Sequence, residues 1–282
     1  MLTNFQLGDV VEHRGIVVAP LFPRRDPTAA YVTLDDALPK GLRITEVDEA
    51  GTVPELVVEN PLDARVLLYD GEELVGAKQN RILNVSVLIE AKSKLRIPVS
   101  CVEQGRWSRT SASFASGNHV SHAQLRRWKA ETQAARPMAR GVAQSVVWGE
   151  LHERMVSMSI DSPTGASADL YRSRQNELHA LEAAFPVVPG QCGVFFGLGD
   201  EMCIDVVSRP DAFARLWPKL RAGYLLDALG RLDGKPTPFA VVPTFLSRVD
   251  RAVAARQRSV GLGEDVRLLG EHVIGTGFEL ES

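Results

Sequence analysis

The chain has 282 residues, of which 45% are hydrophobic and 24% charged, and its formal net charge is −3. These values exclude a disordered tail or linker and describe a folded protein with a full core. The N-terminus lacks the features of a signal peptide, and no apolar run reaches the roughly 18 residues of a membrane span, so we expect a cytoplasmic protein without membrane association.

The first third of the chain reads as short strands. Runs rich in β-branched residues are separated by Gly, Pro and Asp, which favours a mostly antiparallel sheet. The expected strands cover residues 10–22, 42–48, 55–60, 64–70, 72–77, 82–90 and 95–103. A Ser-, Gly- and Asn-rich segment at 108–118 has no apolar period and predicts a mobile or lid-like loop.

Helical patterns follow, at residues 122–136, 141–158 and 168–185. The next two runs, CGVFFGL and MCIDVVS, predict a hairpin that turns at Gly199 and Asp200. Its register pairs Cys203 with Phe196 and leaves Cys192 on the order of 13 Å further along. A disulfide needs Cα atoms within about 7 Å, so we predict free thiols.

The C-terminal part begins with a helix at 210–229, which Pro210 opens and Pro218 interrupts. Strands are expected again at 237–246 and in a hairpin at 268–280. The order of strands, helices and strands predicts an α+β fold, because a doubly wound sheet requires regular alternation. Without a repeat or linker, we expect a single α+β domain over residues 1–282, with a possible helical subdomain at about 120–185.

Polar side chains are densest between residues 67 and 107, inside the expected strands. A turn at Asp70 and Gly71 would pair Leu68 with Glu73 and send Glu72 and Glu73 to opposite, otherwise apolar faces. Burial would raise the pKa of at least one glutamate and suit it to acid/base chemistry. The alternative is that both glutamates lie exposed at the mouth of the hairpin.

The segment that follows supplies hydrogen-bonding groups for a phosphate, ribose or amide ligand, namely Lys78, Gln79, Asn80, Arg81 and Asn84. In a regular strand Asn84 faces away from the core, where a solvated sheet face also explains it. Cys101 fits a buried structural thiol, because an activated cysteine needs a nearby histidine, cation or helix N-terminus. Trp107 fits either a ring that packs on a ligand or a core residue.

Charge is unevenly distributed. Residues 92–140 carry ten basic and two acidic side chains, a formal charge of +8 that suggests a surface facing a small anionic ligand such as phosphate. A solvated helix face is the alternative for Arg126 and its neighbours. A nucleic-acid partner is not expected, because the sequence lacks a recognition module and its pI is about 6.1.

Two strings carry a family resemblance. GEELVGAKQNRILN at 71–84 and IPVSCVEQGRW at 97–107, followed by an Arg-bearing helix and AQSVVW at 143–148, resemble the proteins associated with ADP-ribosylglycohydrolases and rhodanese-like phosphatases. The resemblance implies a link to NAD and ADP-ribose metabolism and assigns no roles to residues. The motif positions that match are Glu73, Lys78, Gln79, Asn80, Asn84, Cys101, Glu103, Gln104, Arg106 and Trp107.

Two functions therefore compete. In the first, an enzyme of the hydrolase or transferase class acts on a phosphorylated ligand of the NAD or ADP-ribose class. Glu73 or Glu103 is its acid/base, and the expected ligand-binding residues are Lys78, Gln79, Asn80, Asn84, Gln104, Arg106, Trp107 and Arg126. In the second, a noncatalytic module senses the same ligand or docks on a protein. A purely structural role would leave the motif side chains paired internally.

Cofactor and metal motifs are missing from the sequence. His119 and His122 are three residues apart and would share a helical face if the helix began early, but no HExxH, CxxC or acidic loop supports a metal site, and we expect none. Glycine-rich phosphate loops do not occur either. The sequence names no cofactor, and an exposed sheet edge leaves a homo-oligomer possible.

Overall fold

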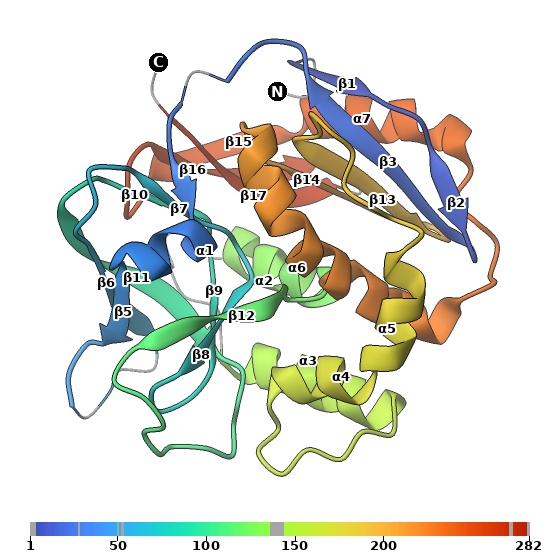
Figure 1. Cartoon of the computed structure of the whole chain (residues 1–282). Coiled ribbons are helices and arrows are strands. Elements are labelled where there is room, and N and C mark those ends of the chain that lie inside the picture. Colours follow the sequence, from blue (N-terminus) through green and yellow to red (C-terminus); the bar gives the residue numbers. More distant parts are fainter. Residues whose placement is uncertain are drawn as a thin grey trace.

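A computed structural model describes residues 4–27, 29–49, 51, 54–135, 144–270 and 273–280, and it has the expected α+β fold (Figure 1). The helices are α1 (Leu34–Ala37), α2 (Ala123–Ala135), α3 (Gln144–Ser157), α4 (Ser167–Ser173), α5 (Gln175–Glu182), α6 (Pro210–Ala228) and α7 (Val242–Arg251). Short 3-10 turns are η2 (Leu38–Lys40), η3 (Leu229–Arg231) and η4 (Phe239–Val241).

The strands form four sheets. They are β1 (Phe5–Leu7), β2 (Val11–His13), β3 (Ile16–Pro23), β4 (Val32–Thr33), β5 (Arg43–Glu46), β6 (Glu55–Asn60), β7 (Val66–Leu68), β8 (Glu72–Gly76), β9 (Arg81–Leu83), β10 (Val87–Ile89), β11 (Ser93–Cys101), β12 (Phe114–Val120), β13 (Gly193–Leu198), β14 (Glu201–Val206), β15 (Val253–Arg258), β16 (Glu264–Gly270) and β17 (Val273–Glu279). Pairing is antiparallel between these strands except for β4 with β7.

The first sheet joins distant parts of the chain, in the order β1-β3-β13-β14, with β2 also paired to β3. The β13–β14 hairpin turns at Gly199 and places Phe196 opposite Cys203, so the predicted register is confirmed. Phe196 also lies opposite Val18 of β3. Cys101, Cys192 and Cys203 are free, which confirms the predicted thiols.

The six-stranded sheet β12-β8-β9-β11-β6-β5 carries most of the motif residues. The single strand expected at 82–90 is wrong, because the chain bends after Leu83. There β9 pairs with β8 and β11, whereas β10 pairs with β7 in a separate sheet. Asn84 lies in this bend and is buried, so its expected position on a solvated face is also wrong.

The hairpin expected around Asp70 and Gly71 does not form. The chain does turn there, since Gly71 has φ +83° and the amide of Glu72 donates to the carbonyl of Tyr69. However, β7 pairs with β10 and β4, and β8 pairs with β9 and β12, so Leu68 and Glu73 are not partners. The predicted turn is present, but the strands before and after it pair with strands from other parts of the sequence.

α6 lies at the centre of the molecule, between the N-terminal sheet and the six-stranded sheet (Figure 1). It packs against β12, β13 and α5, and its buried side chains include Phe213, Trp217 and Leu220. Its first half has an exposed side at Asp211, Arg215 and Pro218, whereas residues 222–228 are all buried, so the second half of α6 lies within the core.

Three further expectations need correction. Residues 114–120 form β12 within the segment expected to be a loop, and β12 pairs with β8 through Phe114 and Ser116. The helix expected at 168–185 is broken at Arg174 into α4 and α5. The strand expected at 237–246 is instead η4 and α7, because Pro243 opens a helix whose buried residues recur at Val242, Phe245 and Val249.

The C-terminal hairpin of β16 and β17 is as predicted, and β15 joins it as a third strand. Among the described residues, no helix is long and apolar enough to cross a membrane.

Candidate functional site

The motif strings at 71–84 and 97–107 meet where β8, the turn after it and the end of β11 lie side by side. Five side chains come together there, and we refer to them as the carboxylate centre: Glu73, Asn80, Glu103, Arg106 and His119. β8 supplies Glu73, and β12, paired to β8, supplies His119. The backbone N–H of Asn80 donates to Glu103 Oε2 at 3.1 Å, and this bond joins the two strings.

Glu103 lies at the outer side of the carboxylate centre and is fully hydrogen-bonded. Arg106 Nη2 lies 2.6 Å from Glu103 Oε2 and also donates to Asn80 Oδ1 at 3.0 Å. Thr164 Oγ1 contacts Glu103 Oε1 at 3.2 Å. Burial opposes ionisation of Glu103, but the bonds from Arg106 and Asn80 outweigh it and lower the pKa of this carboxyl.

Glu73 lies deeper and has the opposite electrostatic setting. Its side chain is 1% exposed, and Oε1 is buried without a hydrogen-bond partner among the described residues. Burial, together with the negative charge of Glu103, raises the pKa of Glu73 from 4.5 to about 8, although the Asn80 side chain opposes the shift. Glu73 is therefore protonated at neutral pH.

His119 faces Glu73 across the carboxylate centre. Its Nε2 lies 3.5 Å from Glu73 Oε2 and makes no hydrogen bond within the described part of the chain. The imidazole stacks on Tyr171 of α4, with ring centroids 3.6 Å apart. Burial, with a smaller contribution from the positive charge of Lys219, lowers the pKa of His119 to about 3, so the ring is neutral.

Gly117 of β12 lies against Glu73 and is a glycine for a steric reason. A Cβ on Gly117 would lie 2.7 Å from Glu73 Oε2 and 2.8 Å from Glu73 Cβ. Real Cβ atoms do not approach that closely, so the space that Glu73 occupies depends on Gly117 having no side chain. The carboxylate centre thus holds two carboxyl groups in different protonation states, one neutral and deep, one ionised and near the surface.

The other predicted site residues are dispersed. Gln79 is buried, donates to the carbonyl of Glu103 at 2.9 Å and accepts from Arg81 at 3.0 Å, so it braces the carboxylate centre. Trp107 is 48% exposed, with Lys78 Nζ 5.3 Å from its ring centroid, and so is a surface ring and not a core residue. Gln104 is also exposed.

Asn84 and Cys101 are buried away from any reactive geometry. Asn84 Oδ1 accepts from Ser100 at 2.8 Å, and the Asn84 carbonyl accepts from Gln133. The thiol of Cys101 donates to Gln79 Oε1 at 2.9 Å, and burial raises its pKa. Cys101 therefore has the environment of a structural thiol, as the sequence favoured.

Arg126 does not reach the carboxylate centre. Its guanidinium forms two bonds of 2.7 Å with Asp205, which also accepts from the hydroxyls of Tyr69 and Tyr224. Other basic side chains of the +8 stretch are likewise paired, as Lys129 is with Asp70 at 2.6 Å. Carboxylates from other parts of the sequence thus neutralise much of the charge that suggested an anion-facing surface.

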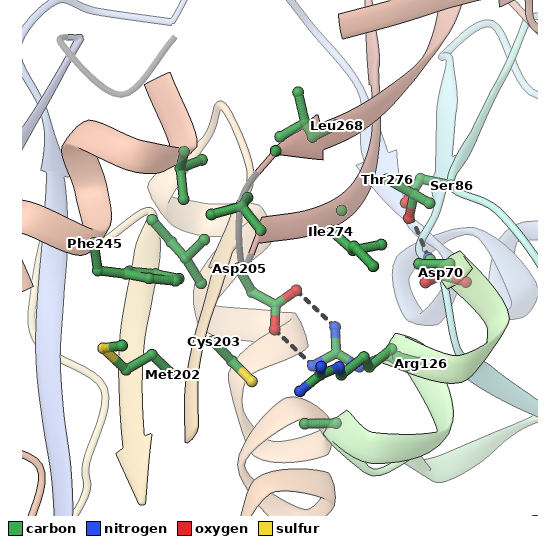
Figure 2. A pocket seen from close by; sticks show the side chains of 18 of the residues that line it. Asp70, Ser86, Arg126, Met202, Cys203, Asp205, Phe245, Leu268, Ile274 and Thr276 are labelled. Carbon is green, nitrogen blue, oxygen red and sulfur yellow. Dashed lines mark hydrogen bonds and ion pairs between the residues drawn. The ribbon is translucent and has the colours of Figure 1, made fainter. Parts of the chain in front are cut away.

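A cavity of about 250 Å³ lies beside this ion pair, not beside Glu73 (Figure 2). α2, β14, α7 and the β16–β17 hairpin surround it, together with Tyr69, Asp70 and Ser86. Of the residues expected to bind a ligand, Arg126 lines it. The remaining cavity residues were not expected to bind a ligand, because Asp205 and Thr276 join Arg126 only through the tertiary fold.

Metal binding has no structural support in the described residues, where no group of three or more His, Cys, Asp or Glu side chains could hold an ion. His119 belongs to β12 and faces Glu73, whereas His122 precedes α2 and lies 2.6 Å from Glu150. The two histidines do not share a helical face, because the chain is extended until Val120.

Three residues of the site were not predicted from the sequence. His119 was considered for metal alone, although its neighbour in space is Glu73. Tyr171 and Thr164 carried no signal, since they reach the carboxylate centre from α4 and from the segment before it, about 60 residues beyond the motif strings. Gly105 donates to the carbonyl of Thr164 at 2.7 Å and fixes that segment against the motif.

Comparisons with known proteins give one match. The family model described as the ARG and Rhodanese-Phosphatase-superfamily-associated Protein domain matches residues 4–282. Neither the curated proteins nor the solved structures include a match.

Proposed function

The chain belongs to the family of ARG and Rhodanese-Phosphatase-superfamily-associated Protein domains, and from this premise we propose that it binds and processes a phosphorylated small molecule of the NAD or ADP-ribose class. The chemistry is acid/base catalysis by carboxyl groups. The ligand class rests on the association with ADP-ribosylglycohydrolases in the family description, and the chemistry rests on the carboxylate centre.

The observation that carries the proposal is the contrast between Glu73 and Glu103. Their surroundings move the two pKa values in opposite directions, with Glu73 at about 8 and Glu103 below its ordinary value. Pairs of titratable groups whose pKa values are pushed apart are typical of acid/base sites, because one group then donates a proton while the other accepts one. A purely structural pair gives no reason for a neutral acid with an unpartnered oxygen.

The roles follow from the positions. Glu73, neutral at pH 7, is the general acid that protonates the leaving group, and Glu103, ionised and nearer the surface, is the base. His119 faces Glu73 with an unpartnered Nε2 and, because burial lowers its pKa to about 3, stays neutral and leaves the proton on Glu73. Arg106 is already bonded to Glu103 and Asn80, so it holds the base in place and does not serve as a phosphate anchor.

The ligand approaches from the side of Glu103. Trp107, which follows Arg106 in the chain, offers an exposed ring for a base or sugar, and Lys78 lies against the same ring. Arg106 and Glu103 retain side-chain exposures of 14% and 9%, whereas Glu73 has 1%. The ion pair between Arg106 and Glu103 therefore covers Glu73, and a ligand that reaches Glu73 has to separate these two side chains.

We place this activity in the cytoplasm. The three cysteines are free thiols, two of them fully enclosed, which is the usual state in a reducing compartment.

The test is turnover by the purified chain of NAD, ADP-ribose and ADP-ribosylated amino acids, followed by chromatography of the products. The wild type should convert at least one of them, and Glu73→Gln should lose about 10²–10⁴-fold in rate, as expected for the loss of a general acid. Glu59→Gln on β6 is the matched control, since Glu59 is exposed and should leave the rate unchanged. No turnover of any of these compounds by the wild type would refute the catalytic proposal.

A noncatalytic ligand sensor is the second candidate, and one observation favours it. Gln79, Asn80 and Glu103 are all hydrogen-bonded within the chain, as in a scaffold. Saturable thermal stabilisation by the same compounds without turnover would select this candidate, because a ligand that binds only the folded state stabilises it.

A further inference from the structure

The cavity of about 250 Å³ forms where α2, β14, α7 and the β16–β17 hairpin meet (Figure 2). None of the residues of the carboxylate centre lines it. Ligand cavities form at such junctions of several elements, with mostly apolar walls and a few fixed polar groups. The question is which chemistry this cavity accepts.

Its charged groups are paired and held in place. Asp205 receives two bonds of 2.7 Å from Arg126, one of 2.7 Å from the Tyr69 hydroxyl and one from the Tyr224 hydroxyl. Four donors occupy the acceptor sites of this carboxylate, so it neither accepts from a ligand nor leaves Arg126 as an unbalanced cation. The Asp70 carboxylate is paired with Lys129 at 2.6 Å.

The fourth charged lining residue, Arg127, is paired with Glu131 at 2.9 Å. Because these charges cancel, the cavity has no electrostatic preference for phosphate or for a cationic ligand. An ionic ligand would lose its hydration on entry and would find no opposite charge that is not already matched. The cavity therefore favours an uncharged molecule, in contrast to the anionic ligand that the basic stretch of the sequence suggested.

Its remaining polar groups suit hydroxyl donors. Lys129 contacts Oδ1 of Asp70, and no other described side chain bonds to this carboxylate, which leaves Oδ2 as an acceptor. Ser86 accepts from the amide of Asp70 at 3.0 Å and retains its own hydroxyl proton, and Thr276 adds a second hydroxyl on β17. Asp70, Ser86 and Thr276 lie together on one side of the cavity in Figure 2.

The apolar wall is formed by Phe245 and Val249 of α7, Leu268 of β16 and Ile274 of β17, and Ile274 is 40% exposed. In Figure 2 Phe245 lies across the cavity from Asp70, Ser86 and Thr276, and Ile274 lies between them on the side of Thr276. A flat ring fits such a wall, because an aromatic or heterocyclic face loses little hydration on burial. The exposure of Ile274 shows that this wall reaches the protein surface, from which a ligand can enter.

We propose that this cavity is a second ligand site, which binds an uncharged ring compound bearing hydroxyl groups, of the nucleoside type. The ring packs between Phe245 and Ile274, and the hydroxyls donate to Asp70 and pair with Ser86 and Thr276. Pockets for drug-sized ligands span roughly 300–1,000 Å³, so the cavity has room for a ring with one sugar and not for a dinucleotide. The site goes beyond the acid/base function and does not depend on it.

Calorimetric titration of the full chain with adenosine, AMP and ribose tests this assignment. Adenosine should bind saturably, and AMP, which differs by a charged phosphate, should bind at least tenfold more weakly. Ribose should bind more weakly than adenosine because it lacks the flat heterocyclic base. Absence of saturable adenosine binding, or tighter binding of AMP, would overturn the proposal.

Variants locate the binding. Ile274→Glu places a charge at the cavity wall on a residue that is already partly exposed, and it should weaken adenosine binding at least tenfold. Val156→Glu on α3 is the matched control, because Val156 is 65% exposed and does not line the cavity. Thr276→Val, nearly equal in volume, should weaken binding about fivefold through the loss of one hydroxyl.

Glu73→Gln separates the two proposals. It should leave adenosine affinity unchanged even if it abolishes turnover, since Glu73 does not line the cavity. Equal adenosine affinity in the wild type and in Ile274→Glu would place the binding elsewhere and refute this site, whatever the outcome of the turnover assay.

Discussion

Glu73 Oε2 and His119 Nε2 lie 3.5 Å apart in the interior of the six-stranded sheet, and each residue has a buried polar atom without a partner in the described chain. Burial keeps the first side chain protonated and the second unprotonated at neutral pH, with pKa values of about 8 and about 3. An acid and a base thus face each other without ionising, which is a costly arrangement in a protein interior.

The pH dependence of stability should carry the signature of this pair. The unfolded chain releases the Glu73 proton near pH 4.5 and the folded chain near pH 8, so stability falls as pH rises between these values. The unfolded chain protonates His119 near pH 6.5 and the folded chain near pH 3, so stability falls as pH drops through that range. Each slope is about 1.4 kcal/mol per pH unit.

The two slopes cancel between pH 4.5 and 6.5, where the contribution of the pair is flat and highest. Denaturant unfolding at a series of pH values measures it. Glu73→Gln should abolish the decline from pH 6.5 to 8 and uncover the rise from pH 4.5 to 6.5. An unchanged profile in this variant would mean that Glu73 titrates normally.

Asp205 should be among the most sensitive positions for stability. Asp205→Asn removes a buried carboxylate that balances Arg126, and breaking such a pair costs about 3–5 kcal/mol. The control is Asp233→Asn, which removes the exposed partner of Arg14 and should change the free energy of unfolding very little. Equal effects of the two substitutions in urea unfolding would contradict the central position given to Asp205.

Gly117→Ala should disturb the carboxylate centre through steric contact alone. The added methyl would lie 2.7 Å from Glu73 Oε2, and overpacking of this kind costs about 1–3 kcal/mol. Gly149→Ala on α3 is the matched control, because nothing lies within 4 Å of its Cβ and a helical alanine gains about 0.5–1 kcal/mol over glycine. Thermal melts should move in opposite directions for the two variants.

The cysteines should react slowly in the native protein. Burial raises the pKa of Cys192 to about 11 and that of Cys203 to about 12, where the nearby positive charge of Arg126 offsets only part of the effect. Since the thiolate is the nucleophile, labelling by a disulfide reagent at pH 8 should be at least 100-fold slower than in denaturant. Rapid stoichiometric labelling of the native chain would show that these thiols are accessible and ionised.

Elements with local determinants were predictable from the sequence. The β13–β14 hairpin was placed to the residue, because Gly199 and Asp200 form a tight turn between two runs that then pair with each other. The turn at Gly71 was also recognised, yet its strands were paired wrongly. β7 is a three-residue strand that pairs with β10 and β4, and nothing near Asp70 encodes those partners.

The site was predictable only in part for the same reason. Polar residues within the expected strands pointed to Glu73 and Glu103 as candidate acid/base residues. Of the two alternatives for Glu73, a buried carboxyl with a raised pKa or an exposed one, the structure has the first. The stacking of His119 on Tyr171 depends on how α4 docks on β12, and the pairing of Arg126 with Asp205 joins residues 79 positions apart. Neither contact can be predicted from neighbouring residues. The basic stretch was therefore interpreted as an anion-facing surface, although distant carboxylates neutralise Arg126 and Lys129.

The central claim is that Glu73 keeps its proton at neutral pH, and infrared difference spectroscopy tests it most directly. The spectrum of the wild type minus that of Glu73→Gln at pH 7 should contain the carbonyl stretch of a protonated carboxylic acid. The band should disappear on titration with a midpoint near pH 8. A carboxylate band in its place at pH 7, with a midpoint near 4.5, would contradict the account.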